Sequence, residues 1–517
     1  MLKLLLFFNV IRLCLYSVDS YKILGIFPVP SISHQIVFQP IWKELSLRGH
    51  EVTVITPNPL NDKSLVNLTE IDVSFSYKIF IESNLQESIT KDVPVNGVVD
   101  FIFTLMLNII EAQLKHPEVQ ALIQDKDKHF DLVMVEFLNP AVYAFSARFQ
   151  CPLIGMTSLG ALLGGHDAVG NPSHPLLHSD FFLPSTGELS FFDRVYNTMY
   201  TIWYRYNYYY NVLPHHDKLV KKYIGDDLPY LGDIERNVSM LFINENSIFH
   251  SIKPNVPAVI ELSNMHIKKK KPLPKDLQNE LDTATEGVVY FSLGSNVRSA
   301  NLSEHLREQI IGALSEVPYK IIWKWEDDYL PGQPKNVIIR PWLPQQDILG
   351  HPNIKVFVTQ GGQQSAEEAI YYGVPLVGMP FFGDQFLITE KIANLGIAHV
   401  VNPETLTKQQ LKAAIVEVAE NSKYREKAKE MSALSLDMPL TGLEKAIWWT
   451  EYVIRHKGAR HLRSPVLNIP WYQYVLLDVI GFILLVCLIV TFVLYKIILL
   501  GIKGRQKYSR HIKLKVS

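Results

Sequence analysis

The segment Trp342–Gln385 holds an aromatic ring, a glycine pair, a carboxylate and an Asp-Gln dipeptide at ordered intervals. Its pattern predicts a strand at Lys355–Thr359, a tight turn at Gly361-Gly362 and a helix at Gln364–Tyr372. A glycine turn that leads into a helix offers free backbone N–H groups and the positive end of the helix dipole. Such a turn can bind a diphosphate without a metal ion.

Residues on either side of this turn suit the other parts of a nucleotide sugar. Trp342 can stack on a base, and Gln345 can hydrogen-bond the edge of that base. Glu368 shares a helix face with Gln364 and Ser365, and its carboxylate can accept hydrogen bonds from two ribose hydroxyls. Asp384-Gln385 follows an apolar strand, at the sheet edge where α/β proteins collect ligands, and suits sugar hydroxyls. Together, in this order, these residues predict a nucleotide-sugar site.

The N-terminal half predicts a second place for chemistry. A strand at Lys22–Phe27, a helix at Ile36–Arg48 and a strand at Glu51–Thr56 form a βαβ unit. Because ligands collect at the C-terminal ends of parallel strands, the loop Pro28–His34 is expected at the mouth of a cleft.

The histidine that ends this loop has two interpretations. It is either a polar residue near a helix N-terminus or a general base whose ring is oriented by a carboxylate. The apolar strand Phe130–Glu136 ends in such a carboxylate. We therefore expect His34 and Glu136 to form a catalytic pair.

Length and composition favour a two-domain protein outside the nucleic-acid-binding classes. The chain has 517 residues and is 48% hydrophobic, and its formal net charge is −1. Single cores stop growing at about 250–300 residues, so this length predicts two domains and an appendage. The basic run Lys268–Lys271 is interpreted as an exposed linker, and Asp125-Lys126-Asp127 as a surface loop rather than a metal site.

The two ends of the chain predict a membrane protein of the secretory system. Residues 1–20 resemble a cleaved signal peptide, and residues 471–501 are apolar for long enough to cross a bilayer. The basic tail at 502–517 is expected in the cytosol and all that precedes the span in the lumen. One span excludes a transporter.

Short motifs are compatible with this placement. Sequons begin at Asn67, Asn237 and Asn301. Lys513 and Lys515 either form a dilysine retrieval signal or anchor the tail to anionic lipid. Cys151, the one cysteine outside the predicted signal and span, is interpreted as a buried small hydrophobe.

The segment Trp342–Gln385 resembles the signature of the UDP-glycosyltransferases, in particular the animal membrane-bound branch. The stretches FPVPSISH, FDLVMVE and VVYFSLGS and the C-terminal span also fall in that family's order, so the resemblance covers most of the chain. It implies an α/β protein in the GT-B arrangement, with two Rossmann-like domains facing across a cleft, plus one transmembrane helix.

The resemblance also implies roles for individual residues. It implies the base, ribose and sugar contacts given above. It also implies that the phosphates are contacted by Ser295, Thr359, Gln360, Gly361, Gly362, Gln364 and Ser365. Gln360 stands where the family usually has histidine, which resembles the insect members, and implies UDP-glucose as the donor. An amide donates the same hydrogen bond but carries no positive charge.

From these features we predict inverting transfer of a hexose, most simply glucose, to a hydroxyl of a small lipophilic acceptor. His34 is the expected base, and neither a metal nor another cofactor is required. The expected setting is the endoplasmic reticulum membrane, as a single-pass type I protein, and a homo-oligomer is compatible with the sequence. A lumenal binding or chaperone module that keeps the same fold is the alternative function.

The resemblance divides the chain into six parts. They are a signal peptide at 1–20, an acceptor-binding domain at 21–262, a UDP-sugar-binding domain at 263–447, a return helix and juxtamembrane segment at 448–470, the span at 471–501 and the tail at 502–517. The aromatic segment Phe191–Val212 has three interpretations: it lines the acceptor pocket, lies against the membrane or packs in a core.

Overall fold

A computed structural model describes residues 20–83, 93–177, 180, 182–183, 189–250 and 252–516, with side chains described as far as Lys507. The chain forms two compact units, residues 1–463 and 464–517. The predicted signal peptide up to residue 19 and the side chains of Lys513 and Lys515 lie outside the described residues.

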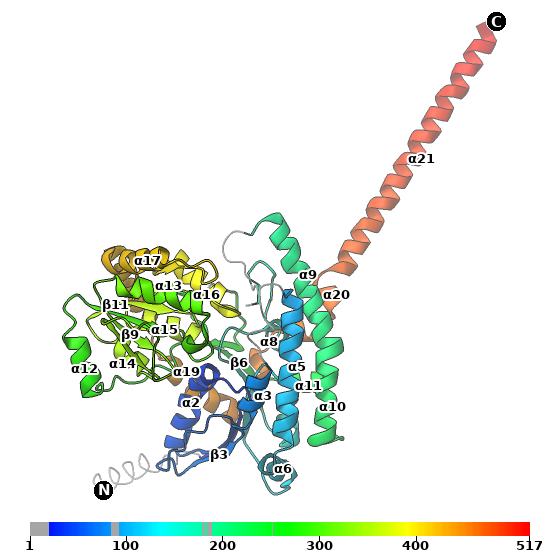
Figure 1. The fold of residues 1–517 in the computed structure, drawn as a ribbon. Helices are drawn as coiled ribbons and strands as arrows, with labels where there is room; N and C mark the ends of the chain where they lie inside the picture. The colour runs from blue at the N-terminus through cyan, green and yellow to red at the C-terminus, as the bar shows by residue number, and fades with distance from the viewer. Residues whose placement is uncertain are drawn as a thin grey trace, which may run out of the picture. The chain divides into compact units, whose positions relative to one another are not determined.

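The N-terminal lobe is built on a parallel sheet in the order β3-β2-β1-β4-β5-β6-β7 (Figure 1). Its strands are β1 (Lys22–Ile26), β2 (Glu51–Thr56), β3 (Leu68–Asp72), β4 (Leu132–Glu136), β5 (Leu153–Thr157), β6 (Met240–Ile243) and β7 (Val259–Glu261). Strand β4 is buried throughout, as its continuous apolar sequence predicts for a central parallel strand.

Helices cover both faces of this sheet. They are α2 (Ile32–Leu47), α3 (Ser76–Glu82), α5 (Val95–Leu114), α6 (Pro117–Gln124), α7 (Ala144–Arg148), α8 (Leu163–Val169), α9 (Phe191–Asn207), α10 (Leu213–Tyr223) and α11 (Leu231–Glu235). A 3₁₀ turn, η1 (Pro140–Tyr143), precedes α7, and a π-helical segment, η2 (Tyr208–Val212), joins α9 to α10. Helix α2 begins before the predicted Ile36, so His34 lies in its first turn rather than in the preceding loop.

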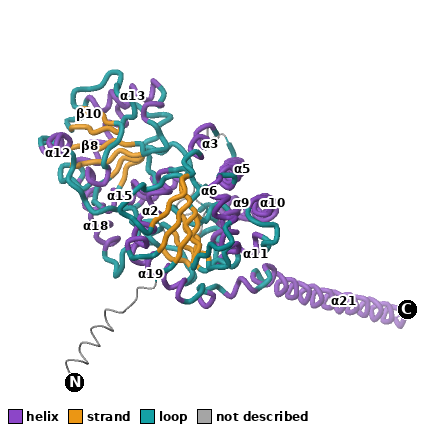
Figure 2. The backbone as a smooth tube through the Cα atoms, turned by 90° about the horizontal axis from the view of Figure 1, so that it is seen from below, coloured by secondary structure: helices purple, strands orange, loops and turns teal. Residues whose placement is uncertain are grey.

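The C-terminal lobe has a second parallel sheet, in the order β10-β9-β8-β11-β12-β13, and Figure 2 shows both sheets in orange. Its strands are β8 (Val288–Ser292), β9 (Lys320–Lys324), β10 (Val337–Arg340), β11 (Ile354–Thr359), β12 (Leu376–Gly378) and β13 (Ala398–Val400). The helices are α12 (Lys275–Asp282), η3 (Ser299–Asn301, 3₁₀), α13 (Glu304–Ser315), α14 (Gln345–Leu349), α15 (Gln363–Tyr371), α16 (Asp384–Asn394), α17 (Lys408–Glu420) and α18 (Ser422–Leu436). The predicted strand–turn–helix around Gly361 is confirmed, with bounds shifted by one residue.

After the C-terminal lobe the chain returns to the N-terminal lobe. Helix α19 (Gly442–Arg455) packs Ala446, Ile447 and Val453 into the same apolar cluster as α2. The helix begins before residue 448 because Thr441 and Glu444 form a capping box that fixes its first turn. Two 3₁₀ turns follow, η4 (Arg460–Leu462) and η5 (Pro465–Asn468).

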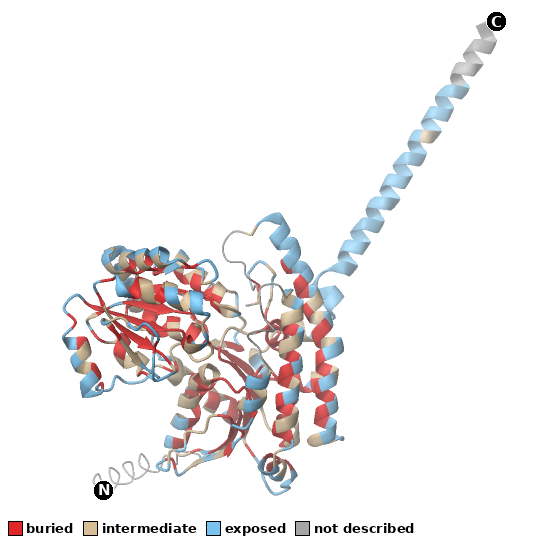
Figure 3. Ribbon diagram, in the orientation of Figure 1, coloured by how far each residue is buried: buried red, intermediate tan, exposed pale blue. Residues whose placement is uncertain are grey.

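The second unit contains the candidate membrane span. A short helix, α20 (Trp471–Tyr474), precedes the long helix α21 (Leu477–Val516), whose stretch Leu477–Lys507 contains an 18-residue segment with a mean hydropathy of 2.9. The long helix starts at Leu477 rather than at the predicted Trp471, because Leu476 has a left-handed backbone, φ 58°, that ends α20. Its apolar residues are exposed, and the ribbon of this helix is mostly pale blue in Figure 3.

Helix α5 also has the length and hydropathy of a membrane span. It contributes Ile109 and Ile110, both almost fully buried, to clusters within the N-terminal lobe. We therefore treat α5 as a core helix.

The aromatic segment forms α9 and η2 and has two different faces. Tyr200, Tyr204 and Tyr208 are buried in one cluster with Phe103 of α5, as the core interpretation predicts. The opposite face exposes apolar side chains, namely Phe191, Phe192, Val195, Tyr196, Met199, Ile202, Tyr206 and Tyr210.

Candidate functional site

The predicted pair forms at the C-terminal edge of the N-terminal sheet. Nδ1 of His34, in α2, lies 2.5 Å from Oε1 of Glu136, the last residue of β4. Glu136 is fully buried, and its other oxygen accepts a hydrogen bond from the backbone N–H of Val29 at 3.3 Å. The carboxylate thus has a fixed position. A proton on Nδ1 pointing to it leaves Nε2 of His34 with a free lone pair.

A third side chain contacts the same ring nitrogen. The Oγ atom of Ser158, in the turn after β5, lies 3.0 Å from Nδ1 of His34. Ser158 was not predicted as a site residue, although the sequence carries a signal for it. The residue follows a buried strand that ends at the same sheet edge as β1 and β4, where polar side chains of parallel strands meet.

A cavity of about 480 Å³ is lined by both lobes. That volume is in the range of small-molecule sites. From the N-terminal lobe it is lined by Ser33, His34 and Leu159. From the C-terminal lobe it is lined by predicted residues, namely Ser295, Trp342, Gln345, Gln360, Gly362, Gln364, Ser365, Glu368, Asp384 and Gln385. Thr359 and Gly361, which were also predicted to contact the phosphates, do not line this cavity: Thr359 is the buried last residue of β11, and Gly361 is buried in the turn after it.

The lining of this cavity includes an exposed ring and a buried, hydrogen-bonded carboxylate. Trp342 is 64% exposed, and Lys324 Nζ lies 5.9 Å from its ring centroid. Gln345 donates to Glu368 Oε2 at 2.6 Å and to Ser365 Oγ at 3.1 Å, and Gln346 donates to Glu368 Oε1 at 2.8 Å. Burial raises the pKa of Glu368 to about 7, although both amides oppose the shift. The group can therefore both accept and donate hydrogen bonds near neutral pH.

The glycine turn before α15 is sterically required. Gly361 has φ 82°, and a Cβ there would lie 2.1 Å from Thr389 Cγ2. Gln360 is buried beside Gly294, and its Oε1 has no hydrogen-bond partner among the described residues. A buried, unpaired amide oxygen beside a helix N-terminus suits a ligand hydroxyl, and its amide N–H suits a phosphate.

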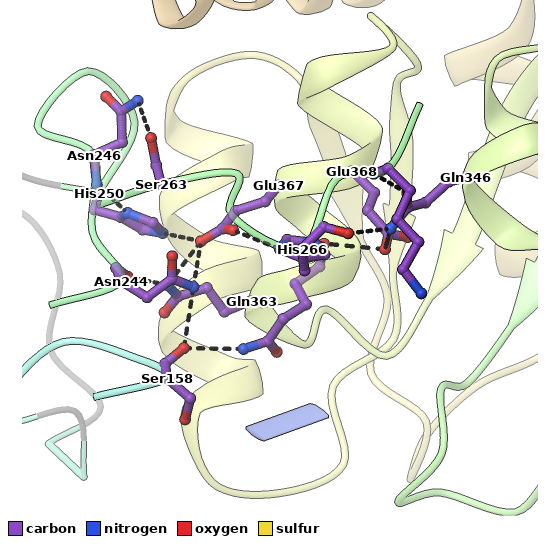
Figure 4. A network of polar contacts seen from close by, with 12 residues as sticks. Ser158, Asn244, Asn246, His250, Ser263, His266, Gln346, Gln363, Glu367 and Glu368 are labelled. Carbon is purple, nitrogen blue, oxygen red and sulfur yellow. Dashed lines mark hydrogen bonds and ion pairs between the residues drawn. The ribbon is translucent and has the colours of Figure 1, made fainter. Parts of the chain in front are cut away.

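The side chains at the start of α15 contact the other lobe. Gln364 Nε2 donates to the backbone carbonyl of Ser158 at 3.0 Å. Gln363 Nε2 donates to the backbone carbonyl of Asn244, and Asn244 Nδ2 donates to Glu367 Oε1 at 3.1 Å. Figure 4 shows Ser158, Asn244, Gln363 and Glu367 in one network.

The two residues of the Asp-Gln dipeptide have different surroundings. Gln385 is buried, and its Oε1 accepts hydrogen bonds from the backbone N–H groups of Phe381 and Phe382. It therefore holds the loop before α16. Asp384 is half-buried at the cavity wall, and desolvation raises its pKa to about 6, while the nearby His34 opposes the shift.

A second, largely apolar cavity of about 180 Å³ adjoins the first. Its wall includes Val99, Phe103 and Met106 of α5. Five residues line both cavities, namely His34, Leu159, Asn296, Phe382 and Asp384. The lining contains no residue of Phe191–Val212, so within the described residues the pocket-lining interpretation of that segment is not supported.

The basic run contributes more than a linker. Lys268–Lys271 is exposed as predicted, yet three of its lysines line the larger cavity. Its backbone is held there because Lys268 N–H donates to Gln346 and Lys271 N–H to Asp347. Asp125 lies in an exposed turn and accepts from the N–H groups of Asp127 and Lys128, as the surface interpretation predicts.

Two parallel α/β lobes that line one cavity with strand ends and helix N-termini have the GT-B arrangement. Solved structures share the fold. Glycosyltransferase VinC in complex with dTDP has a TM-score of 0.59 and 18% identity, covering 84% of this chain and 100% of its own. For TcCGT1 in complex with UDP the TM-score is 0.57 and the identity is 15%, and the match covers 85% of this chain and 100% of the TcCGT1 chain.

The chain belongs to the UDP-glycosyltransferase family, whose profile, described as UDP-glucoronosyl and UDP-glucosyl transferase, matches residues 22–510. UDP-glucosyltransferase 2 of Dactylopius coccus is 35% identical, covering 94% of this chain and 96% of its own. UDP-glucuronosyltransferase 2B15 of Rattus norvegicus is 32% identical, and the match covers 94% of this chain and 93% of the rat protein. The predicted family and fold are confirmed, and the protein is a UDP-glycosyltransferase that takes sugar from a UDP-sugar.

Glu367 provides a test of the network between the lobes. Burial raises its pKa from 4.5 to about 8, although hydrogen bonds from Gln363 and Asn244 oppose the shift. Between these pH values the folded protein binds more protons than the unfolded chain, so stability falls as pH rises. We expect Glu367→Gln to weaken the loss of thermal stability between about pH 5 and pH 8. Thermal melts of both proteins measure this; parallel pH profiles would contradict it.

Proposed function

We propose that the protein transfers glucose from UDP-glucose to a hydroxyl of a small lipophilic acceptor, with inversion at the anomeric carbon. His34 accepts the acceptor proton while the oxygen attacks the face opposite to UDP, and Glu136 stabilises the imidazolium. The uracil stacks on Trp342, Glu368 binds the ribose, and Asp384 binds the sugar. The diphosphate leaves toward the Gly361-Gly362 turn and the N-terminus of α15.

One observation carries this proposal. His34 and Asp384 both line the polar cavity and the apolar cavity, so the base lies where a donor and an acceptor would meet. The apolar walls contributed by α5 suit a lipophilic acceptor. Glucose is favoured because the similar Dactylopius coccus protein is named a UDP-glucosyltransferase.

The sequence supports the remaining parts of the proposal. The basic tail after the span and the sequons before it favour a lumenal catalytic part in the endoplasmic reticulum membrane. Backbone N–H groups and a helix dipole supply the charge stabilisation that some transferases obtain from a metal ion, so the proposed reaction uses no metal or other cofactor.

An activity assay tests the proposal. Microsomes that contain the full-length protein are incubated with radiolabelled UDP-glucose and a panel of phenols, and both UDP release and labelled product are measured. We expect both to depend on an acceptor. Retention of UDP-glucose without UDP release would instead indicate a binding module. Parallel reactions with UDP-glucuronic acid, UDP-xylose and UDP-galactose identify the sugar, and preference for any of them would contradict glucose.

The proposed stacking residue can be tested without disturbing a core. Trp342 is largely exposed, so Trp342→Ala is not expected to impair folding. Loss of base stacking should raise the KM for UDP-glucose by roughly 10-fold, with kcat little changed because stacking is equal in ground and transition states. Trp342→Phe keeps a ring and is the matched control. An unchanged KM for UDP-glucose in Trp342→Ala would show that the base binds elsewhere.

A further inference from the structure

Ser158 contacts both halves of the site through different atoms. Its hydroxyl oxygen lies 3.0 Å from His34 Nδ1. Its backbone carbonyl accepts hydrogen bonds from two side-chain amides, Asn244 Nδ2 at 3.1 Å and Gln364 Nε2 at 3.0 Å. The residue is almost fully buried, so these contacts do not compete with bulk water.

We propose that Ser158 is a positioning residue: its hydroxyl holds the His34 ring, and its carbonyl fixes that hydroxyl to α15 of the C-terminal lobe. The inference rests on the proposed role of His34 as the base. In this role Ser158 acts through the histidine and not on the reacting atoms.

One carboxylate is not sufficient to fix the orientation of the His34 ring. The contact of Glu136 with Nδ1 fixes that nitrogen but leaves rotation of the ring about the contact. A second acceptor on the same nitrogen, supplied by a different strand end, restricts this rotation. Nε2 is then held toward the junction of the two cavities, and small errors in base placement are known to cost large factors in rate.

Ser158 in turn depends on the C-terminal lobe. Two lone pairs of its carbonyl are used by the two amides, which fixes the orientation of the turn after β5. Each amide belongs to a residue with a further link. Asn244 is held by Glu367, whereas Gln364 lines the cavity proposed for the donor. A change at Gln364 is therefore transmitted to the histidine through Ser158.

Kinetics of the full-length protein test the role of the hydroxyl. We expect Ser158→Ala to lower kcat by roughly 10-fold and to leave the KM for UDP-glucose within about 2-fold. Ser158→Thr keeps the hydroxyl and should retain more activity than Ser158→Ala. An unchanged kcat in Ser158→Ala would overturn the inference.

Double variants test the link to α15. If Gln364 positions Ser158, then Ser158→Ala should cost only about 2- to 3-fold in a Gln364→Ala background. Gln363→Ala is the matched control, because it removes the neighbouring contact between the lobes without touching Ser158. In that background Ser158→Ala should keep its full roughly 10-fold cost. Equal costs in both backgrounds would show that α15 does not act through Ser158.

A chemical readout separates this inference from the proposed function. The rate at which diethyl pyrocarbonate modifies His34, followed by peptide mass spectrometry, requires no turnover. We expect a faster reaction in Ser158→Ala, because the ring is less restrained. If the wild type transfers no sugar but this rate rises, the proposed function fails while Ser158 still positions the ring. An unchanged rate overturns the positioning role in either case.

Discussion

Replacing His34 by alanine should abolish sugar transfer while UDP-glucose binding is retained. The general base and its oriented ring are lost together, and removal of the base from a catalytic set of this kind lowers kcat by about 1,000-fold or more. His34 lies at one edge of the larger cavity, whereas the proposed base, ribose and phosphate contacts all belong to the C-terminal lobe. Donor affinity should therefore change little.

Two measurements on purified full-length protein decide this prediction. Product formation gives kcat. Titration with UDP, followed by the quenching of tryptophan fluorescence, gives the affinity of the donor site. His34→Gln is the matched control for packing, because it keeps a polar side chain of similar length but supplies no base near neutral pH. Turnover at the wild-type rate in either variant would exclude His34 as the base. Loss of UDP binding in both variants would indicate a role in the donor site instead.

Features that depend on local sequence were predicted well. The strand before Gly361, the glycine turn and the helix after it follow from apolar periodicity and turn chemistry, and the structure confirms them. Strand β2 has the predicted bounds, Glu51–Thr56, because a continuous run of β-branched residues lies between two polar turns. The contact of His34 with Glu136 was predictable because parallel strands end at one sheet edge.

Features that depend on contacts between distant segments were not predicted. Helix starts were displaced because capping and backbone angles fix a terminus more closely than periodicity does, as at His34 in α2. Gln364 was assigned to the phosphates from resemblance, yet in the structure its amide donates to Ser158, 206 residues away in sequence. No local pattern encodes such a pairing. Nor does composition show that a lysine run in a linker lines a cavity.

Gln360 shows how the site accommodates its departure from the usual histidine. The amide lies against Gly294, where any side chain would collide with it: a Cβ at Gly294 would be 2.4 Å from Gln360 Nε2. Glycine at position 294 therefore leaves room for this amide. Positive charge from a histidine is absent at this position, so the proposed stabilisation of UDP depends more on the turn and on the dipole of α15.

Replacing Glu136 by glutamine should lower kcat almost as much as removing His34, by about 1,000-fold or more, with little change in fold. The two side chains have nearly the same shape, and Glu136 is fully buried beside Val29 N–H. An amide N–H facing Nδ1 would favour the tautomer that carries its proton on Nε2, and a protonated Nε2 cannot accept the acceptor's proton. Steady-state kinetics measure kcat, and a thermal melt reports the fold.

Glu136→Asp separates the effect of the carboxylate charge from the effect of side-chain length. It keeps the carboxylate, and with it the tautomer, but moves the oxygens away from the ring, so we expect a kcat between those of the wild type and Glu136→Gln. Because the gap between Glu136 Oε1 and His34 Nδ1 is only 2.5 Å, a shorter side chain must lengthen this contact unless β4 moves. The order wild type, Asp, Gln in kcat would show that the carboxylate sets the tautomer. Equal kcat in the Gln variant and the wild type would mean that His34 holds its reactive tautomer without help from residue 136.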